Sequence, residues 1–268
     1  DPYGIKALQC SLFDEFAQGH FNSIELLINL NSFGFIREAC HALGTTFDDT
    51  TLFADLVEYE PTRMDASEKS ISELNEIAGG DYWKPIIVAY KKGEIDGYDA
   101  EALFAEKYCM RLRKSYKYVL NMPLRIKKGQ RPKYRLIHAT NHRDGCLLMV
   151  DNICNRWEAL QEIQSGGQMQ LWAENFDNQA VDEDDIEEKT ILHFSQYNCL
   201  TSLHDALAMF FMNYGPICST GYVKKILKGL EEDKRLLVLR NPDYTSRGKK
   251  TAFMTEGKGQ KISVRWIR

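Results

Sequence analysis

Hydrophobic spacing near the start of the chain predicts a helix and then a strand. The segment Ile5–Phe16 carries apolar residues at helical intervals, and the short apolar run Ser23–Leu30 is typical of a buried parallel strand. A turn, a helix and a strand in this order make half of a β-α-β unit. The cluster Asp1–Gly4 would then follow an earlier strand, at the edge where open α/β sheets bind their ligands. We therefore expect this chain to be the back part of a larger protein, beginning in its own active-site loop.

The middle of the chain predicts a helical insert and then a pair of strands. The stretch 44–93 is more polar and is broken by prolines and glycines, and Asp99–Leu120 has the pattern of a long helix. Met122–Ile126 and Tyr134–Thr140 are expected as neighbouring strands, the second of them antiparallel to its neighbours. A further amphipathic helix is expected over Gly145–Leu160.

The last part of the chain predicts helices followed by a two-stranded ribbon. Thr201 or Ser202 can cap a helix that ends near Tyr214, and Ser219 can cap a second one. The apolar runs 236–239 and 261–266 then enclose a loop rich in Arg and Lys. Helices followed by a basic ribbon are the pattern of a winged helix-turn-helix.

These patterns predict an α/β chain of two domains. Residues 1–165 are expected to form a Rossmann-like sheet domain that lacks its N-terminal half and carries a helical insert over 44–120; that this sheet is of the methyltransferase type is implied only by the resemblance given below. Residues 166–190 are expected to be an acidic linker, and residues 191–268 a winged-helix-like α+β domain.

The winged-helix-like part carries its cations where such modules meet DNA. Two groups are the candidate nucleic-acid contacts, one on the outer face of the second helix and one at the turn of the ribbon: Lys224, Lys225, Lys228, Arg247, Lys249 and Lys250. Many winged helices serve only as protein–protein joints, so an acidic protein partner remains the alternative.

Charge is segregated along a chain whose net charge is only −4. Residues 107–133 contain ten basic and no acidic residues, residues 219–268 have a net charge of +8, and residues 171–190 have a net charge of −7. Blocks of this kind indicate surfaces with different partners rather than a particular fold. The alternative is that each block is simply a solvated helix face or linker.

Composition narrows the class of protein further. Hydrophobic residues make up 44% of the chain and charged residues 27%, which is ordinary for a globular protein. No apolar run approaches the roughly 20 residues that span a bilayer, so no membrane contact is expected. The seven cysteines lack paired spacing and the six histidines are dispersed, so we expect no metal site and a reducing, cytoplasmic setting.

The candidate chemistry lies in Asp1-Pro2-Tyr3. In amino-methyltransferases such a loop follows a central strand, and its acidic or amide side chain accepts hydrogen bonds from the target NH2 group. Asp1 would be that acceptor, Pro2 the rigid element and Tyr3 the ring that stacks on a flat base. An ordinary turn is the alternative explanation of the same residues.

Four segments in succession resemble one known family. DPYGIK, ELLINLNSFGFIREA, GGDYWKPII and YRLIHATNHRDGCLLM look like the three-Cys-motif partner (TcmP) proteins, which are methyltransferase-like and are encoded beside radical-SAM-type proteins. The similarity runs through most of residues 1–160, and the tail resembles the family's winged-helix-like part. The order and spacing of the segments are more specific than any one of them.

The resemblance implies an activity, a cofactor and partners. Asp1, Pro2 and Tyr3 fall on the catalytic loop, Tyr3 also contacts the substrate, and Asn31 and Arg37 are further substrate or phosphate contacts. S-adenosylmethionine is the implied cofactor, although the glycine-rich turn that would hold it is missing from this sequence. Nucleic acid and a radical-SAM-type protein are the implied partners.

Two functions therefore compete at this point. The first is an S-adenosylmethionine-dependent methyltransferase, or a fragment of one, that acts on an amino group of a nucleic-acid base. The second is a catalytically inactive, methyltransferase-like protein that binds DNA or a radical-SAM-type partner. A nuclease or hydrolase is disfavoured, because no nucleophile beside a histidine and no metal-type histidine cluster stands out.

Overall fold

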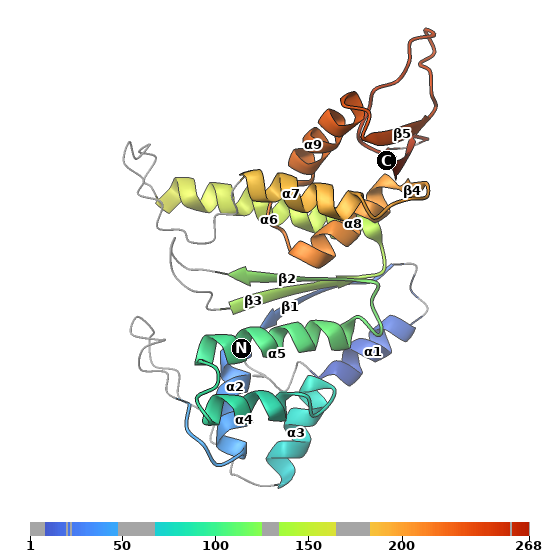
Figure 1. Cartoon of the computed structure of the whole chain (residues 1–268). Coiled ribbons are helices and arrows are strands. Elements are labelled where there is room, and N and C mark those ends of the chain that lie inside the picture. Colours follow the sequence, from blue (N-terminus) through green and yellow to red (C-terminus); the bar gives the residue numbers. More distant parts are fainter. Residues whose placement is uncertain are drawn as a thin grey trace. The chain divides into compact units, whose positions relative to one another are not determined.

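The computed structural model describes residues 9–19, 21, 23–47, 68–124, 134–164, 183–257 and 259–267, with backbone only at 68–69, 124, 134, 157–164 and 183. The chain separates into two compact units (Figure 1). Unit 1 contains the described residues up to Leu124 together with Tyr134–Asn141, and unit 2 begins at His142. Both combine helices with an antiparallel sheet, so the chain is a mixed α/β protein, as expected in broad class.

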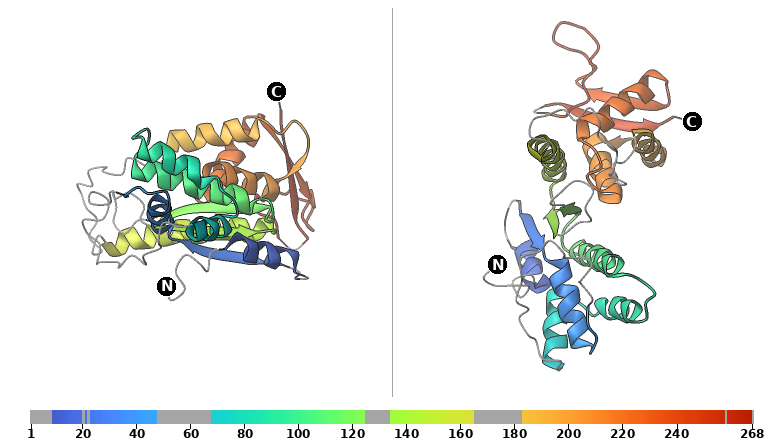
Figure 2. Two further views of the ribbon diagram at one scale, coloured as in Figure 1. Left: turned by 90° about the horizontal axis from the view of Figure 1, so that it is seen from below. Right: turned by 90° about the vertical axis from the view of Figure 1, so that its left-hand side faces the viewer.

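Unit 1 places helices on a three-stranded sheet (Figure 2). Its strands are β1 (Glu25–Leu30), β2 (Tyr118–Leu124) and β3 (Tyr134–Thr140). Its helices are α1 (Cys10–Gln18), α2 (Ser32–Ala42), α3 (Glu68–Ala78), α4 (Trp83–Lys91) and α5 (Gly97–Leu112).

The sheet order is β1-β3-β2, and β3 is antiparallel to both neighbours. The prediction of two neighbouring strands with the second antiparallel to its neighbours is therefore confirmed. Pro123 is tolerated in β2 because this strand lies at the edge of the sheet among the described strands.

The prediction that Ser23–Leu30 is a buried parallel strand is wrong for the pairing that the structure describes. Strand β1 pairs antiparallel with β3, from Glu25 opposite Thr140 to Leu30 opposite Arg135. Burial along β1 alternates: Ile28 and Leu30 are buried, whereas Leu27 is 57% exposed. An apolar residue on the exposed face made the run look continuous and hid its period of two.

The core of unit 1 is rich in aromatic side chains that bring α2, α4 and α5 together. The ring of Phe35 stacks on Phe104 with centroids 4.0 Å apart, and Trp83 meets Phe35 edge-on at 6.0 Å. Ile137 and Ala139 of β3 belong to the same buried cluster. Alternate residues of the strand thus attach the sheet to the helices.

A buried ion pair fixes the start of β3 to the helices. Arg135 holds Glu101 of α5 through two hydrogen bonds, of 2.5 and 2.7 Å, and the Ser32 hydroxyl donates to the same carboxylate. Glu101 is 2% exposed, and Arg135 also donates to the amide oxygen of Asn121 in β2 at 3.3 Å. These bonds join the central strand β3, the edge strand β2, the start of α2 and the middle of α5.

The long helix predicted over Asp99–Leu120 is shorter than expected. Asp96 and Asp99 form a reciprocal capping box at its start, and α5 ends at Leu112. The strand β2 already begins at Tyr118, because the β-favouring residues from Tyr118 onward pair with β3. Within the insert predicted over 44–120, the described part is mainly helical, in α3, α4 and α5.

Unit 2 begins with α6 (Arg143–Gln164), which covers the helix predicted over Gly145–Leu160. Its later elements are α7 (Glu183–Phe194), β4 (Thr201–Ser202), α8 (Leu203–Tyr214), α9 (Thr220–Glu232), β5 (Leu236–Asn241) and β6 (Lys261–Trp266). The sheet has the order β4-β6-β5 and is antiparallel throughout.

The acidic linker predicted over 166–190 is partly wrong. Residues 183–190 belong to α7, while residues 165–182 lie outside the described part. Ile186, Thr190 and Phe194 recur at helical spacing and are buried, so the carboxylates between them occupy the outer face of an amphipathic helix. The density of charge hid this apolar stripe.

Loss of the buried ion pair should destabilise the folded chain. Glu101→Gln keeps the volume but leaves the Arg135 guanidinium without its buried counter-charge, so we expect a loss of about 3 kcal/mol in the free energy of unfolding. Chemical denaturation followed by circular dichroism measures this loss. Glu106→Gln, an exposed site on the same helix, should change stability by less than about 0.5 kcal/mol. Equal effects of the two substitutions would show that the pair does not hold unit 1 together.

Candidate nucleic-acid interface

The predicted catalytic residues Asp1, Pro2 and Tyr3 lie outside the described residues. The predicted substrate contacts Asn31 and Arg37 both belong to the α2 region. Asn31 is the N-cap of α2: its side chain accepts a 2.9 Å hydrogen bond from the backbone N–H of Gly34. A Cβ at Gly34 would lie 2.7 Å from the Asn31 amide, so glycine there permits the cap. Arg37 is half-buried in the second turn of the same helix.

The helices α8 and α9 of unit 2 begin where the sequence predicted. Ser202 is the N-cap of α8, and Ser219 is the N-cap of α9, where its hydroxyl accepts from the N–H of Tyr222 at 3.3 Å. Gly215 ends α8 with a φ of 75°, a left-handed conformation that suits glycine. The strands β5 and β6 then form the ribbon, and we call residues 242–260 between them the wing.

The predicted cations of helix α9 differ in how far they are exposed to solvent. Val223, Leu227 and Leu230 are buried and form its inner face. Lys225 and Lys228 are exposed, and Lys228 lies 4.0 Å from the carboxylate of Glu232 on the same helix. Both partners are more than half exposed, so water screens this pair and it contributes little to stability.

Lys224 and the N-terminus of α9 face carboxylates of unit 2 itself. Lys224 is half-buried, and burial lowers the pKa of its ammonium group even though Asp151 and Glu256 act in the opposite direction. Asp151 of α6 accepts hydrogen bonds from the backbone N–H and the hydroxyl of Thr220, both at 2.8 Å. The predicted placement of Lys224 on the outer face therefore needs correction, because α6 and the wing supply anions beside it.

The wing carries the other predicted cations in the open. Tyr244 and Lys250 pair across it, the N–H of Thr245 donates to the Lys249 carbonyl at 2.8 Å, and Gly248 turns the chain with a φ of 72°. Arg247, Lys249 and Lys250 are exposed. Among the described residues, none of these three side chains has a carboxylate within 4.0 Å. Their charges are therefore open to an outside anion.

Ion pairs anchor the base of the wing to the helices. The guanidinium of Arg240 in β5 donates two hydrogen bonds of 2.6 Å to the carboxylate of Glu231 in α9. It also donates to the Phe253 carbonyl at 2.8 Å. Arg240, the cation of β5, is 8% exposed, so its charge stabilises the fold and is not open to an outside ligand. On the other side of the wing, Glu256 accepts from the N–H of Ile262 at 3.2 Å.

The same Glu256 belongs to a cluster that joins the wing, α6 and α8. Its carboxylate lies 3.6 Å from the guanidinium of Arg143, which also donates to Asp205 at 2.7 Å. His204 and Asp144 are joined by a 2.6 Å hydrogen bond beside it. No local pattern predicts this cluster, because its members come from three distant segments of the chain.

A buried histidine supports the helices behind the ribbon. His193 of α7 lies against the rings of Phe210 and Tyr197, and its Nε2 is 3.0 Å from the carbonyl of Ala206. This carbonyl can only accept, so Nε2 carries the proton and Nδ1 faces the Asn213 amide at 3.5 Å. Burial lowers the pKa of His193, so the ring is neutral near pH 7.

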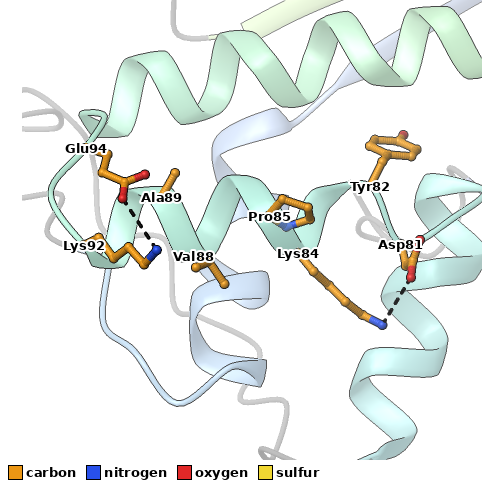
Figure 3. Close-up of a pocket in the computed structure, with 8 residues that line it drawn as sticks. All are labelled: Asp81, Tyr82, Lys84, Pro85, Val88, Ala89, Lys92 and Glu94. Carbon is orange, nitrogen blue, oxygen red and sulfur yellow. Dashed lines mark ion pairs between the residues drawn. The ribbon is translucent and has the colours of Figure 1, made fainter.

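Unit 1 contains a shallow pocket beside α4 (Figure 3). Its volume is about 570 Å³ and its lining includes two ion pairs, Lys84 with Asp81 at 3.8 Å and Lys92 with Glu94 at 3.6 Å. The Tyr82 hydroxyl donates to the Ala78 carbonyl at 2.8 Å, and burial raises its pKa. These groups satisfy one another and do not form a nucleophile–base pair.

The described residues show no reactive buried thiol and no metal-binding cluster. Burial raises the pKa of the Cys10 thiol to about 11 and that of Cys146 to about 12, so these thiols are neutral and poor nucleophiles. The described residues hold no cluster of three His, Cys, Asp or Glu side chains suited to a metal ion. Among the described helices, none has both the length and the apolar character that a bilayer crossing requires.

The buried state of His193 predicts a pH-dependent stability. Its folded pKa lies below the usual value of about 6.5, so on acidification the unfolded chain binds a proton first and the free energy of unfolding falls as pH drops from 7 to 5. One such proton gives a slope of at most about 1.4 kcal/mol per pH unit. His193→Gln keeps a donor for the Ala206 carbonyl and should reduce the slope in urea denaturation series. His138, whose pKa burial also lowers, is unchanged in both proteins, and an equal slope in both would contradict the assignment.

Comparison with protein-family models, with curated proteins and with solved structures found no match to this chain. Its function therefore has to be inferred from its own residues and their geometry.

Proposed function

We propose that this chain binds nucleic acid through unit 2, with the wing and α9 as the contact surface. The observation that carries this proposal is the group of exposed wing cations Arg247, Lys249 and Lys250. They lie on a ribbon that follows a pair of helices in the chain. Such an order, helix-strand-helix-helix followed by a strand, a wing and a strand, is that of winged-helix modules.

The arrangement of the strands supports a wing that projects from a fixed base. The short β4 pairs with β6, and β6 pairs with β5, so the two long strands form a ribbon whose connection is the wing. Arg240 and Glu256 tie both sides of this connection to helices. A fixed base lowers the entropic cost when the wing meets a ligand.

The charge distribution supports a polyanionic ligand. The chain has a net charge of −4, yet the segment 219–268 has a net charge of +8. Cations that have no carboxylate nearby in the described part of the protein gain most from an outside anion, and phosphate groups spaced along a strand suit cations spaced along a wing.

Methyl transfer to a base amino group is a second candidate function, favoured by one observation. A Rossmann-like methyltransferase sheet is expected to end with an antiparallel strand inserted between two others, and β3 lies between β1 and β2 in this way. Asp1, Pro2 and Tyr3 would supply the amino-group acceptor, the rigid element and the stacking ring. Asn31 directly follows the carboxyl end of β1, and Arg37 lies in the helix that begins there.

The described residues do not fit S-adenosylmethionine, the cofactor that such a reaction would use. No glycine-rich turn follows a described strand, and the end of β1 is occupied by the Asn31 cap and by the Glu101–Arg135 pair. An inactive, methyltransferase-like protein that binds DNA or a radical-SAM-type protein is therefore the alternative to catalysis. Either version uses unit 2 for binding.

The nucleic-acid proposal predicts a strong dependence of binding on salt. Each Lys or Arg that contacts a phosphate on duplex DNA should contribute about −0.9 to the slope of log K against log salt concentration. Lys249→Glu/Lys250→Glu should weaken binding for all sequences alike and flatten the slope, because phosphate contacts do not read bases. Fluorescence anisotropy with labelled DNA at several salt concentrations measures both quantities.

The matched control is Lys91→Glu/Lys92→Glu, which reverses two exposed lysines of unit 1. It makes the same change in net charge and should leave the affinity close to that of the unsubstituted chain. If both double variants weaken binding equally, the effect is one of overall charge and the wing is not the contact. Absence of binding to any DNA or RNA at low salt would favour an acidic protein as the partner of unit 2.

The methyl-transfer proposal is tested at Asp1. If the chain, or a longer form that contains it, transfers a labelled methyl group to DNA or RNA, Asp1→Ala should abolish the transfer because the amino group loses its acceptor. Nucleic-acid affinity should stay unchanged, since it depends on unit 2. Unaltered turnover of the variant would remove Asp1 from the reaction.

A further inference from the structure

Helix α9 is poorly disposed to be the main contact in unit 2. Asp151 already accepts from two hydrogen-bond donors at its N-terminus, the N–H and the hydroxyl of Thr220, where an anion would otherwise bind. Lys224 is half-buried near two carboxylates, and Lys228 lies within 4.0 Å of Glu232. A nucleic-acid backbone approaching this helix would meet carboxylates as well as lysines.

The wing offers a different combination of side chains. Tyr244 is 61% exposed, and it lies directly opposite Lys250 in the antiparallel bridge, so the two side chains project from the same face. Arg247 and Lys249 are exposed within the same turn. This exposed aromatic ring, on a wing that also carries three exposed cations, has no role in the core of unit 2.

This combination suits a single strand better than a duplex. Proteins that hold single-stranded nucleic acid stack bases on aromatic side chains and hold the backbone with cations. Bases in a duplex have their faces covered by their neighbours, so the Tyr244 ring has a flat surface to stack on only where a base is unpaired.

The base of the wing holds this surface in place. Arg240 is bonded to Glu231 of α9 and to the Phe253 carbonyl within the wing, and Glu256 is held by Ile262 and Arg143. The two sides of the wing are thus attached to helices, and Tyr244 lies only a few residues beyond Arg240. A ring on such a support loses little freedom when a base stacks on it.

We propose that the wing, with Tyr244 as a stacking ring and Arg247, Lys249 and Lys250 as phosphate contacts, is the primary nucleic-acid contact of unit 2 and selects unpaired bases. This inference rests on the proposed nucleic-acid binding and adds to it the class of nucleic acid and the element that recognises it. Helix α9 then serves as the support of the wing.

The test uses the full chain and three labelled probes of equal length: a DNA single strand, its duplex, and the duplex with a central unpaired loop. Fluorescence anisotropy should show roughly tenfold or tighter binding to the two probes with unpaired bases than to the plain duplex. Tyr244→Ala should abolish this preference by weakening binding to those two probes, with little change on the duplex. Tyr244→Phe keeps the ring and should keep the preference, which separates stacking from a loss of the hydroxyl.

A second pair of variants compares how much the lysines of the wing and the lysines of α9 contribute to affinity. Lys249→Ala/Lys250→Ala should weaken binding to the single strand more than Lys225→Ala/Lys228→Ala does, although each removes two exposed lysines. Thermal unfolding of all variants should match that of the unsubstituted chain, since the substituted side chains are exposed.

Several outcomes would overturn the inference. Salt-dependent binding with equal affinity for all three probes, or with no effect of Tyr244→Ala, would leave nucleic-acid binding in place and remove the role of Tyr244. A larger loss from the α9 pair than from the wing pair would return the main contact to the helix. No binding of any probe at low salt would overturn this inference together with the proposed function.

Discussion

Each sheet of this protein has only three strands in the described residues, and so small a sheet is stable only when helices cover one of its apolar faces. In unit 1, Ile137 and Ala139 of β3 enter the aromatic core formed around Phe35 and Phe104. In unit 2, buried residues of β5 and β6 belong to a layer that α8 and α9 cover. This constraint decides which residues of each strand face inward.

Polar side chains then fix the positions of the connections between helices and strands, which apolar packing alone does not determine. Burial of rings holds helices against a sheet but does not set the register of the loops. The Glu101–Arg135 pair does so where β3 meets α5 and the start of α2, and the pairs of Arg240 and Glu256 do so at the base of the wing. Because the wing cations are left out of these networks, unit 2 divides its charge into a structural set and an exposed set. The exposed set carries the proposed function.

The helices and strands with clear local signals were predictable. Ser202 and Ser219 start α8 and α9, and Gly215 ends the first of them, because hydroxyl caps and a left-handed glycine act within a few residues of chain. The wing cations were also found from the sequence, since a run such as Arg247, Lys249 and Lys250 between two apolar strands has nowhere to be buried. Local chemistry sufficed in these cases.

What the sequence by itself determined was therefore the helices α8 and α9, the two strands of the ribbon that follows them, and the basic character of that ribbon. Only the tertiary structure decided that β1 pairs antiparallel, that α7 extends into the acidic run and that Lys224 is half-buried beside Asp151 and Glu256. Each of these depends on residues far apart in the chain, which no local pattern relates to one another. The physical reason is that strand pairing and burial depend on two segments that pack against each other, whereas a local sequence pattern describes only one of the two segments.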